Sequence, residues 1–104
     1  MSREARKWRL LDTGVRTAAE NIALDQALFD ARVAGEVPNT LRFMQFSPSA
    51  VLVGHHQVVA QEARVDWCAE HSVDINRRLT GGGAIYFDAT QIGGELVGSL
   101  DDFQ

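Results

Sequence analysis

The chain has 104 residues, of which 45% are hydrophobic and 23% are charged, and its formal net charge is −4. This length fits one domain or part of one, and this composition is typical of a globular protein, not of a disordered one. The negative net charge and the lack of a basic run argue against nucleic-acid binding as the main task. No apolar run approaches the length of a membrane helix, so no membrane partner is expected.

The chain has one cysteine, Cys68, which excludes an internal disulfide bond and fits a reducing compartment. The N-terminus is cationic but lacks the apolar core of a signal peptide, so the expected location is the cytoplasm. No Cys or His cluster has metal-ligand spacing, and no structural metal is expected. Cys68 is interpreted as a packed thiol because no neighbouring group in the sequence would activate it.

The first third of the chain predicts a strand at residues 8–13 and a helix at residues 17–34. Thr17 and Glu20 form a T-x-x-E capping box at the start of this helix, and Gly35 is suited to its end. Asp25 is expected on the solvated side. The apolar stripe that recurs at helical spacing consists of Ala23, Leu24, Ala27, Leu28 and Ala31.

The remaining elements predict an α+β fold, a sheet with helices packed on one face. Strands are expected at residues 40–46, 50–53, 73–77, 84–87 and 95–100. In the first of these, Leu41 and Phe43 share a face. A helix is expected at residues 62–71, with Val65, Cys68 and Ala69 directed inward.

A glycine-rich loop follows an arginine pair at residues 77–83. Glycines allow the main chain to turn sharply, and successive N–H groups can form a concave site for a carboxylate or phosphate. Arg77 and Arg78 add positive charge and forked donors beside it. A glycine triplet alone is more often a simple hairpin turn, but the arginines and the Thr80 hydroxyl favour an anion-holding loop.

Three segments resemble the family of lipoate–protein ligases and octanoyltransferases, which has the biotin/lipoate ligase fold. Residues 77–86, R-R-L-T-G-G-G-A-I-Y, are similar to the family signature R-R-x-S/T-G-G-G-A-V/I. Residues 19–25 are similar to a first helix that reads N-x-A-x-D/E, and residues 46–57 to a strand–turn–strand ending V-x-I/L-G-x-x-Q. The resemblance runs from about residue 10 to the end and implies that residues 1–104 are the N-terminal part of a truncated catalytic domain with a mixed sheet.

The resemblance also implies the site residues, since the family's signature loop holds an acyl-adenylate. The lipoyl-adenylate or ATP site would be formed by Arg77, Arg78, Thr80, Gly81, Gly82, Gly83, Ala84, Ile85 and Tyr86. The acyl pocket would be lined by Val53, Gly54, His55 and Gln57. The catalytic lysine or cysteine of the family has no counterpart here and would lie beyond Gln104.

The function implied by this resemblance is a lipoate–protein ligase, which activates lipoate with ATP and Mg²⁺ to lipoyl-AMP and transfers it to a lysine of a lipoyl carrier domain. One alternative is an octanoyltransferase that takes its acyl group from acyl carrier protein. Another is a non-catalytic module that binds a lipoyl group or nucleotide, or docks a carrier domain. A complementary C-terminal subunit or a homodimer is expected, because a divided sheet would expose an edge or an apolar face.

Overall fold

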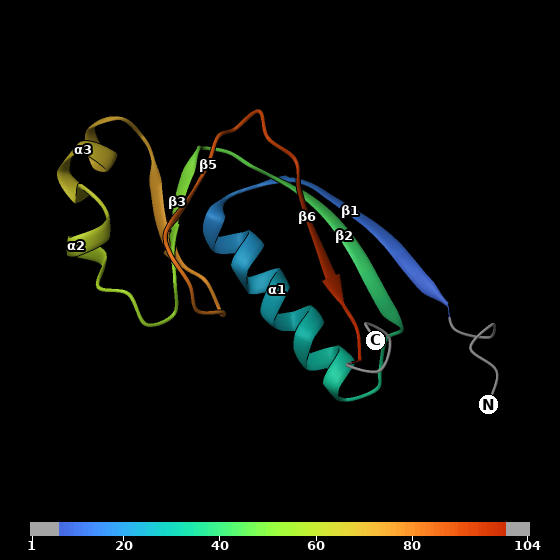
Figure 1. Ribbon diagram of the computed structural model, residues 1–104. Helices are drawn as coiled ribbons and strands as arrows, with labels where there is room; N and C mark the ends of the chain where they lie inside the picture. The colour runs from blue at the N-terminus through green and yellow to red at the C-terminus, as the bar shows by residue number, and fades with distance from the viewer. Residues whose placement is uncertain (1–6, 100–104) are drawn as a thin grey trace.

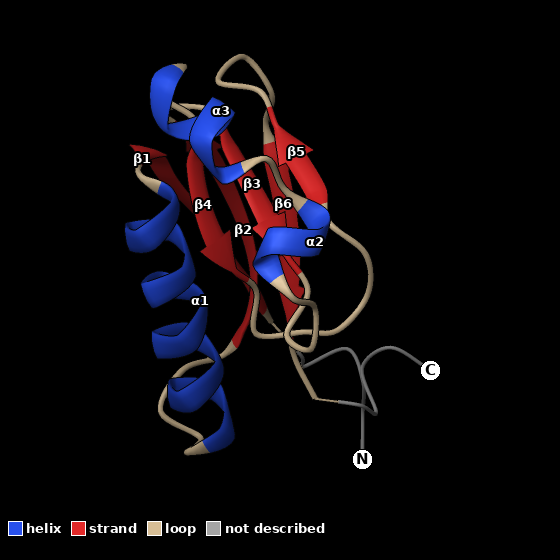
Figure 2. Ribbon diagram, turned by 90° about the vertical axis from the view of Figure 1, so that its left-hand side faces the viewer, coloured by secondary structure: helices blue, strands red, loops and turns tan. Residues whose placement is uncertain are grey.

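The computed structural model describes residues 7–99 of the chain. In chain order its elements are β1 (Trp8–Arg16), α1 (Ala18–Val33), β2 (Asn39–Phe46), β3 (Ala50–Val53), α2 (Val59–Glu62), α3 (Val65–Glu70), β4 (Asp74–Arg77), β5 (Ile85–Phe87) and β6 (Gly93–Val97) (Figure 1). Helix α1 lies alongside the strands, and α2 and α3 lie at the end of the molecule that carries β3 and β4 (Figures 1 and 2).

The strands form two three-stranded sheets, in the orders β1-β2-β6 and β4-β3-β5. Each sheet is mixed: the central strand pairs in parallel with one neighbour and antiparallel with the other. The predicted α+β class with mixed pairing is therefore confirmed, although the strands are divided between two sheets. The central strands β2 and β3 are consecutive in the chain, so residues 47–49 connect the two sheets.

Helix α1 begins and ends as its sequence predicts. The Thr17 hydroxyl accepts a hydrogen bond from the Glu20 amide at 3.2 Å, and the Glu20 carboxylate accepts one from the Thr17 amide at 3.0 Å. The latter hydrogen bond, from the Thr17 main chain, is the largest cause of a lowered pKa of Glu20. Gly35 follows the helix with φ of +74°, the left-handed conformation that favours glycine.

The face of α1 that packs on the strands differs from the predicted stripe. Ala18 and Asn21 are the fully buried residues of the helix, whereas Ala23 and Ala27 are exposed. Asp25 is not on a solvated face as expected but is half-buried and paired with Arg42 of β2. Leu24, Leu28 and Ala31 of the predicted stripe are partly buried, so the prediction is wrong at Ala23 and Ala27 alone. It also missed the polar part of this face, because Asn21 and Asp25 find partners in the interior.

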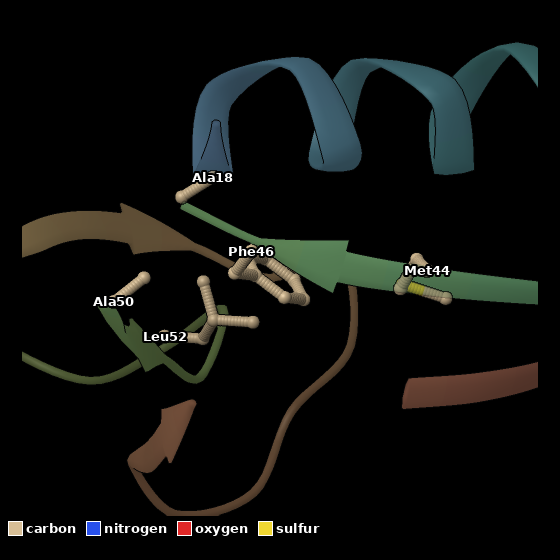
Figure 3. Close-up of a cluster of buried hydrophobic side chains, with 5 residues drawn as sticks. All are labelled: Ala18, Met44, Phe46, Ala50 and Leu52. Atoms are coloured by element: carbon tan, nitrogen blue, oxygen red, sulfur yellow. The ribbon is translucent and has the colours of Figure 1, made fainter. Parts of the chain in front are cut away.

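The buried face of β2 consists of Thr40, Arg42, Met44 and Phe46, and Leu41 and Phe43 share the more exposed face. Phe46 is at the centre of a core that includes Ala18, Met44, Ala50 and Leu52 (Figure 3). Its ring stacks on Phe87 of β5 with centroids 4.6 Å apart. This core therefore joins α1 to both sheets.

The helix expected at residues 62–71 forms only over residues 65–70, as α3, and a separate short helix, α2, precedes it at Val59–Glu62. Cys68 is buried, as predicted, but Val65 and Ala69 are exposed. The last strand begins two residues earlier than expected, at Gly93, and ends at Val97. The predicted end of that strand, Leu100, lies outside the described residues.

Candidate functional site

Two parallel strands, β3 and β4, end side by side and carry the loops of the candidate site. Their last residues, Val53 and Arg77, are paired in register. The turn at residues 54–57 follows β3, and the glycine loop at residues 78–84 follows β4. Ligand sites commonly form where the loops at the carboxyl ends of parallel strands meet.

The turn and the glycine loop are in direct contact through their main chains. The Arg78 amide donates a hydrogen bond to the Val53 carbonyl at 2.8 Å, and the His55 amide donates one to the Thr80 carbonyl at 2.9 Å. A Cβ atom added to Gly54 would lie 2.1 Å from the Gly82 carbonyl oxygen. Glycine is therefore required at residue 54 because the two backbones approach this closely.

Arg78 extends across the glycine loop. Its Nη1 donates to the Leu52 carbonyl at 3.1 Å and its Nη2 to the Gly81 carbonyl at 2.8 Å. A guanidinium has five N–H groups, so this geometry leaves donors for a further acceptor. Gly82 has φ of +100°, which allows the loop to close around this side chain.

The Arg77 side chain makes a different set of hydrogen bonds, all with the turn after β3. Its Nη1 lies 2.9 Å from the Gly54 carbonyl oxygen, 3.0 Å from that of His55 and 2.7 Å from that of Gln57. The Gln57 side chain in turn accepts a hydrogen bond from the Gly54 amide at 2.7 Å. Arg77 and Gln57 therefore stabilise the shape of this turn.

A cavity of about 690 Å³ lies beside these loops, between α1, β6 and the core. Predicted site residues that line it are His55, Arg78, Thr80 and Ile85. Predicted site residues outside its lining are Val53, Gly54, Gln57, Arg77, Gly81, Gly82, Gly83, Ala84 and Tyr86. Most of this second group shapes the loops, and the roles assigned to both groups remain predictions.

Sequence reasoning missed most of the apolar wall of the cavity. The apolar residues that it missed include Ile22 and Phe29 of α1, Met44 and Phe46 of β2, Leu52 of β3, Phe87 of β5, and Leu96 and Val97 of β6. The alternation of residues 40–46 is the signal that could have identified Met44 and Phe46, since side chains two apart share a face. The contribution of α1 has no such signal, because its inward face contains polar residues.

The cavity wall also includes two carboxylates that share one buried arginine. Arg42 is fully buried, and its Nη1 lies 2.5 Å from Asp25 Oδ1 and 2.9 Å from Glu95 Oε1. Burial, followed by the neighbouring Glu95 carboxylate, raises the pKa of Asp25 to about 8. One guanidinium thus faces two carboxyl groups, which favours the binding of a proton by the two carboxyl groups together.

Within residues 7–99, no three His, Cys, Asp or Glu side chains are grouped so that they could hold a metal ion. The helices in this part of the chain are all too short or too polar to cross a membrane.

The sequence matches the family described as "Lipoyl protein ligase A/B catalytic domain" over residues 17–104. The chain belongs to this family. Curated relatives include the octanoyltransferase LipM of Symbiobacterium thermophilum, 44% identical over 79 residues, covering 76% of this chain and 29% of the relative. The LipM of Moorella thermoacetica is 39% identical over 84 residues, covering 81% of this chain and 31% of the relative. The chain thus spans about 30% of the length of these curated family members.

Solved structures of family members have the same fold. Protein Ta0514 of T. acidophilum, solved with bound lipoic acid, superposes with a TM-score of 0.79 at 28% identity, covering 92% of this chain and 39% of that one. A bi-partite lipoate protein ligase of Thermoplasma acidophilum, described with its E2 lipoyl domain, gives a TM-score of 0.69 at 26% identity, covering 88% of this chain and 35% of that one. Lipoate-protein ligase A bound with ATP is 24% identical, with a TM-score of 0.65, covering 94% of this chain and 40% of that one, and supports the fold alone.

Proposed function

We propose that this chain binds a medium-chain acyl group in the cavity and contributes to an octanoyltransferase that passes the group to a carrier-domain lysine. The observation that carries the proposal is the composition of the cavity wall, in which core residues such as Phe46 and Leu52 line the same space as Arg78. The Arg78 guanidinium lies 3.1 Å from the Leu52 carbonyl. An acyl group has the matching two parts. Its hydrocarbon tail gains about 0.8 kcal/mol per buried CH₂, and its carbonyl end needs hydrogen-bond donors.

The size of the cavity supports a small organic ligand. Its volume of about 690 Å³ falls within the range of about 300–1,000 Å³ that is common for such sites. Ligand sites of this kind are usually apolar with a few placed polar groups. His55, Arg78 and Thr80 would supply those polar groups here.

In the proposed reaction, the lysine amine attacks the acyl carbon of a thioester. The new C–N bond forms, the C–S bond breaks, and the thiol leaves with a proton from the amine. Negative charge develops on the acyl oxygen during this step. The unused N–H groups of Arg78 and the main-chain amides of the glycine loop are donors suited to that charge.

Octanoyl transfer is preferred to the ligase reaction because the curated relatives with 36–44% identity are octanoyltransferases. The attacking group in the transfer step is the carrier-domain lysine, and the catalytic cysteine or lysine of the family is expected beyond Gln104. Cys68 is 4% exposed and lies outside the cavity lining, which does not suit a nucleophile.

A second candidate is the lipoate–protein ligase reaction, in which lipoate is first activated with ATP. The favouring observation is the superposition on Ta0514, a relative with bound lipoic acid. In this reaction the glycine loop would hold the adenylate phosphate, with Arg78 beside it. Mg²⁺ would arrive with ATP, held largely by phosphate oxygens.

A titration monitored by NMR tests acyl binding, and a mass assay on the carrier domain separates the two candidates. We expect octanoic acid to shift the amide signals of His55, Arg78 and Thr80 in the 104-residue chain. Arg64, which is exposed at the start of α3 and lies outside the cavity lining, serves as an unshifted reference. Lack of any shift at the three site amides would contradict acyl binding.

The transfer reaction is tested by measuring the mass of the carrier domain after incubation in two mixtures. The first contains octanoyl carrier protein alone, and the second contains lipoate plus ATP. A mass increase in the first mixture supports the transferase, and an increase only in the second supports the ligase.

The acceptor proposed for either reaction is a lipoyl carrier domain. This choice is supported by the structural similarity of the chain to the bi-partite ligase that is described with its E2 lipoyl domain. Completion by another subunit or by a second copy of the chain remains a prediction, tested by sedimentation.

A further inference from the structure

The side chain of Arg77 does not line the cavity, although it belongs to the arginine pair of the signature. It extends from the end of β4 to the turn after β3. There its Nη1 lies between 2.7 and 3.0 Å from three main-chain oxygens. We call these oxygens, from Gly54, His55 and Gln57, the carbonyl ring.

The carbonyl ring has a physical requirement for a cation. Three oxygens with partial negative charge converge on one point and repel one another unless positive charge lies between them. Nη1 has two hydrogens for three acceptors, so the bonds are shared and the charge of the guanidinium contributes to all three. Without Arg77, the turn would lose the group that makes its carbonyls converge.

The turn that Arg77 holds is coupled to the glycine loop. The amide of His55, one member of the carbonyl ring, donates its hydrogen bond to Thr80. Gly54, another member, packs against the Gly82 carbonyl too closely for any side chain. Residues His55 and Thr80 both line the cavity. A change in the turn is therefore transmitted to the polar part of the cavity wall.

We propose that Arg77 is a positioning residue: by binding the carbonyl ring it holds the turn at residues 54–57 against the glycine loop and so fixes the groups that receive the acyl head. This inference rests on the proposed function for the identity of the ligand. The contact between the two loops does not depend on that function. Arg78 contacts the ligand site directly, so the two adjacent arginines have separate tasks.

The experiment uses the 104-residue chain and three variants. Arg77→Met keeps the length of the side chain but removes its charge and donors. Arg77→Lys restores a cation with three donors, which match the three oxygens. Arg64→Met is the matched control, because Arg64 is exposed and lies outside the cavity lining. Amide hydrogen exchange at His55 reports the contact between the loops, and NMR titration with octanoic acid reports binding.

We expect Arg77→Met to accelerate exchange of the His55 amide at least about tenfold relative to the amides of β2, and to weaken octanoic acid binding about tenfold. Arg77→Lys is expected to recover most of both, and Arg64→Met to change neither. Unchanged exchange and binding in Arg77→Met would overturn the proposal, as would an Arg77→Lys chain that behaves like Arg77→Met. If Arg77→Met does not fold, slow exchange at His55 in Arg77→Lys supports the proposal and fast exchange overturns it.

The two readouts separate this inference from the proposed function. If the unaltered chain binds neither octanoic nor lipoic acid, the proposed function is wrong, and the exchange rates alone decide whether Arg77 holds the loops. If the chain binds octanoic acid but His55 exchanges equally fast with and without Arg77, the proposed function stands and this inference is wrong.

Discussion

A single buried arginine connects four elements of this small fold. Arg42 of β2 donates to Thr13 of β1, to Asn21 and Asp25 of α1, and to Glu95 of β6. A buried charge is costly unless it is paired and hydrogen-bonded, and Arg42 meets both conditions. With two carboxyl groups for one guanidinium, however, the cluster has an excess of negative charge when both are ionised.

The Asp25 carboxyl should therefore make stability depend on pH. Its pKa is about 8 in the folded chain, raised by burial and by Glu95 from an ordinary value of 3.8. The folded state then binds the proton more tightly than the unfolded state between these values. The contribution to the free energy of unfolding is fully present below about pH 4 and is lost as the pH rises through about 8. Urea denaturation across this range measures it, and Asp25→Asn, which cannot ionise, should show a flatter profile. An unchanged slope in that variant would contradict the assignment.

The close approach of two glycines gives a second prediction for a single residue. A Cβ at Gly54 would lie 2.1 Å from the Gly82 carbonyl, so Gly54→Ala must push the two loops apart. We expect a loss of about 1–3 kcal/mol in the free energy of unfolding and weaker acyl binding. Gly81→Ala is the matched control, because no atom lies within 4 Å of a Cβ at that position. Equal effects of the two substitutions in denaturation would count against the described packing.

Among the elements, α1 has the strongest local signals and the least obvious inward face. Its limits follow from Thr17, Glu20 and Gly35, whose hydrogen bonds and dihedral angle are decided locally. Its inward face depends on partners that are distant in the sequence. Asn21 donates to the Gln45 carbonyl and Asp25 pairs with Arg42, contacts that hydrophobic periodicity does not indicate.

The capping box at the start of α1 gives a prediction for the stability of this helix. Thr17→Ala should cost about 1 kcal/mol in the free energy of unfolding, because the Glu20 amide loses its acceptor. Glu20→Gln should cost less, since the amide oxygen of glutamine can still accept from the Thr17 amide. Thermal or urea denaturation of the two variants makes the comparison. A larger loss for Glu20→Gln would show that charge, not capping geometry, stabilises this end.

The same distinction between local and distant information explains which parts of the candidate site could be predicted from the sequence. The loop after β4 was predictable because arginines and consecutive glycines are unusual between strands. The apolar wall was not predictable, since in the sequence Ile22, Phe46 and Phe87 look like ordinary core residues. They form a cavity wall only because the fold brings α1, β2 and β5 together. The division into two sheets was also not predictable, because strand propensity says nothing of which strands pair.

At the scale of the molecule, the stack of Phe46 on Phe87 joins the two sheets. Phe46 is 2% exposed and belongs to β2, whereas Phe87 belongs to β5 of the other sheet. Phe46→Ala should lower the free energy of unfolding by about 3–5 kcal/mol. Phe43→Ala, at a side chain that is 37% exposed on the opposite face of β2, should cost much less. Similar losses for both, measured by denaturation, would contradict a core at this position.

The outer face of the first sheet bears on association. Leu10, Leu41 and Leu96 form one row across β1, β2 and β6, and Leu10 and Leu96 are 65% and 58% exposed. Exposed apolar rows favour association. We expect Leu10→Thr to reduce the sedimentation coefficient of the chain at high concentration if copies associate through this face. A chain that is monomeric at every concentration would refute the prediction of a homodimer.

Residues 47–49 form the corner between two sheets that both contribute to one hollow. A small change in the angle at that corner would widen or narrow the space that the acyl tail is proposed to occupy. A molecule lodged there would touch both layers at once and resist their separation. Occupancy should then appear as a higher melting temperature, because a ligand that binds the folded state alone stabilises it. The increase should be greatest for the hydrocarbon length that fills the space, so a series of fatty acids measured by thermal shift would reveal the dimensions of the hollow.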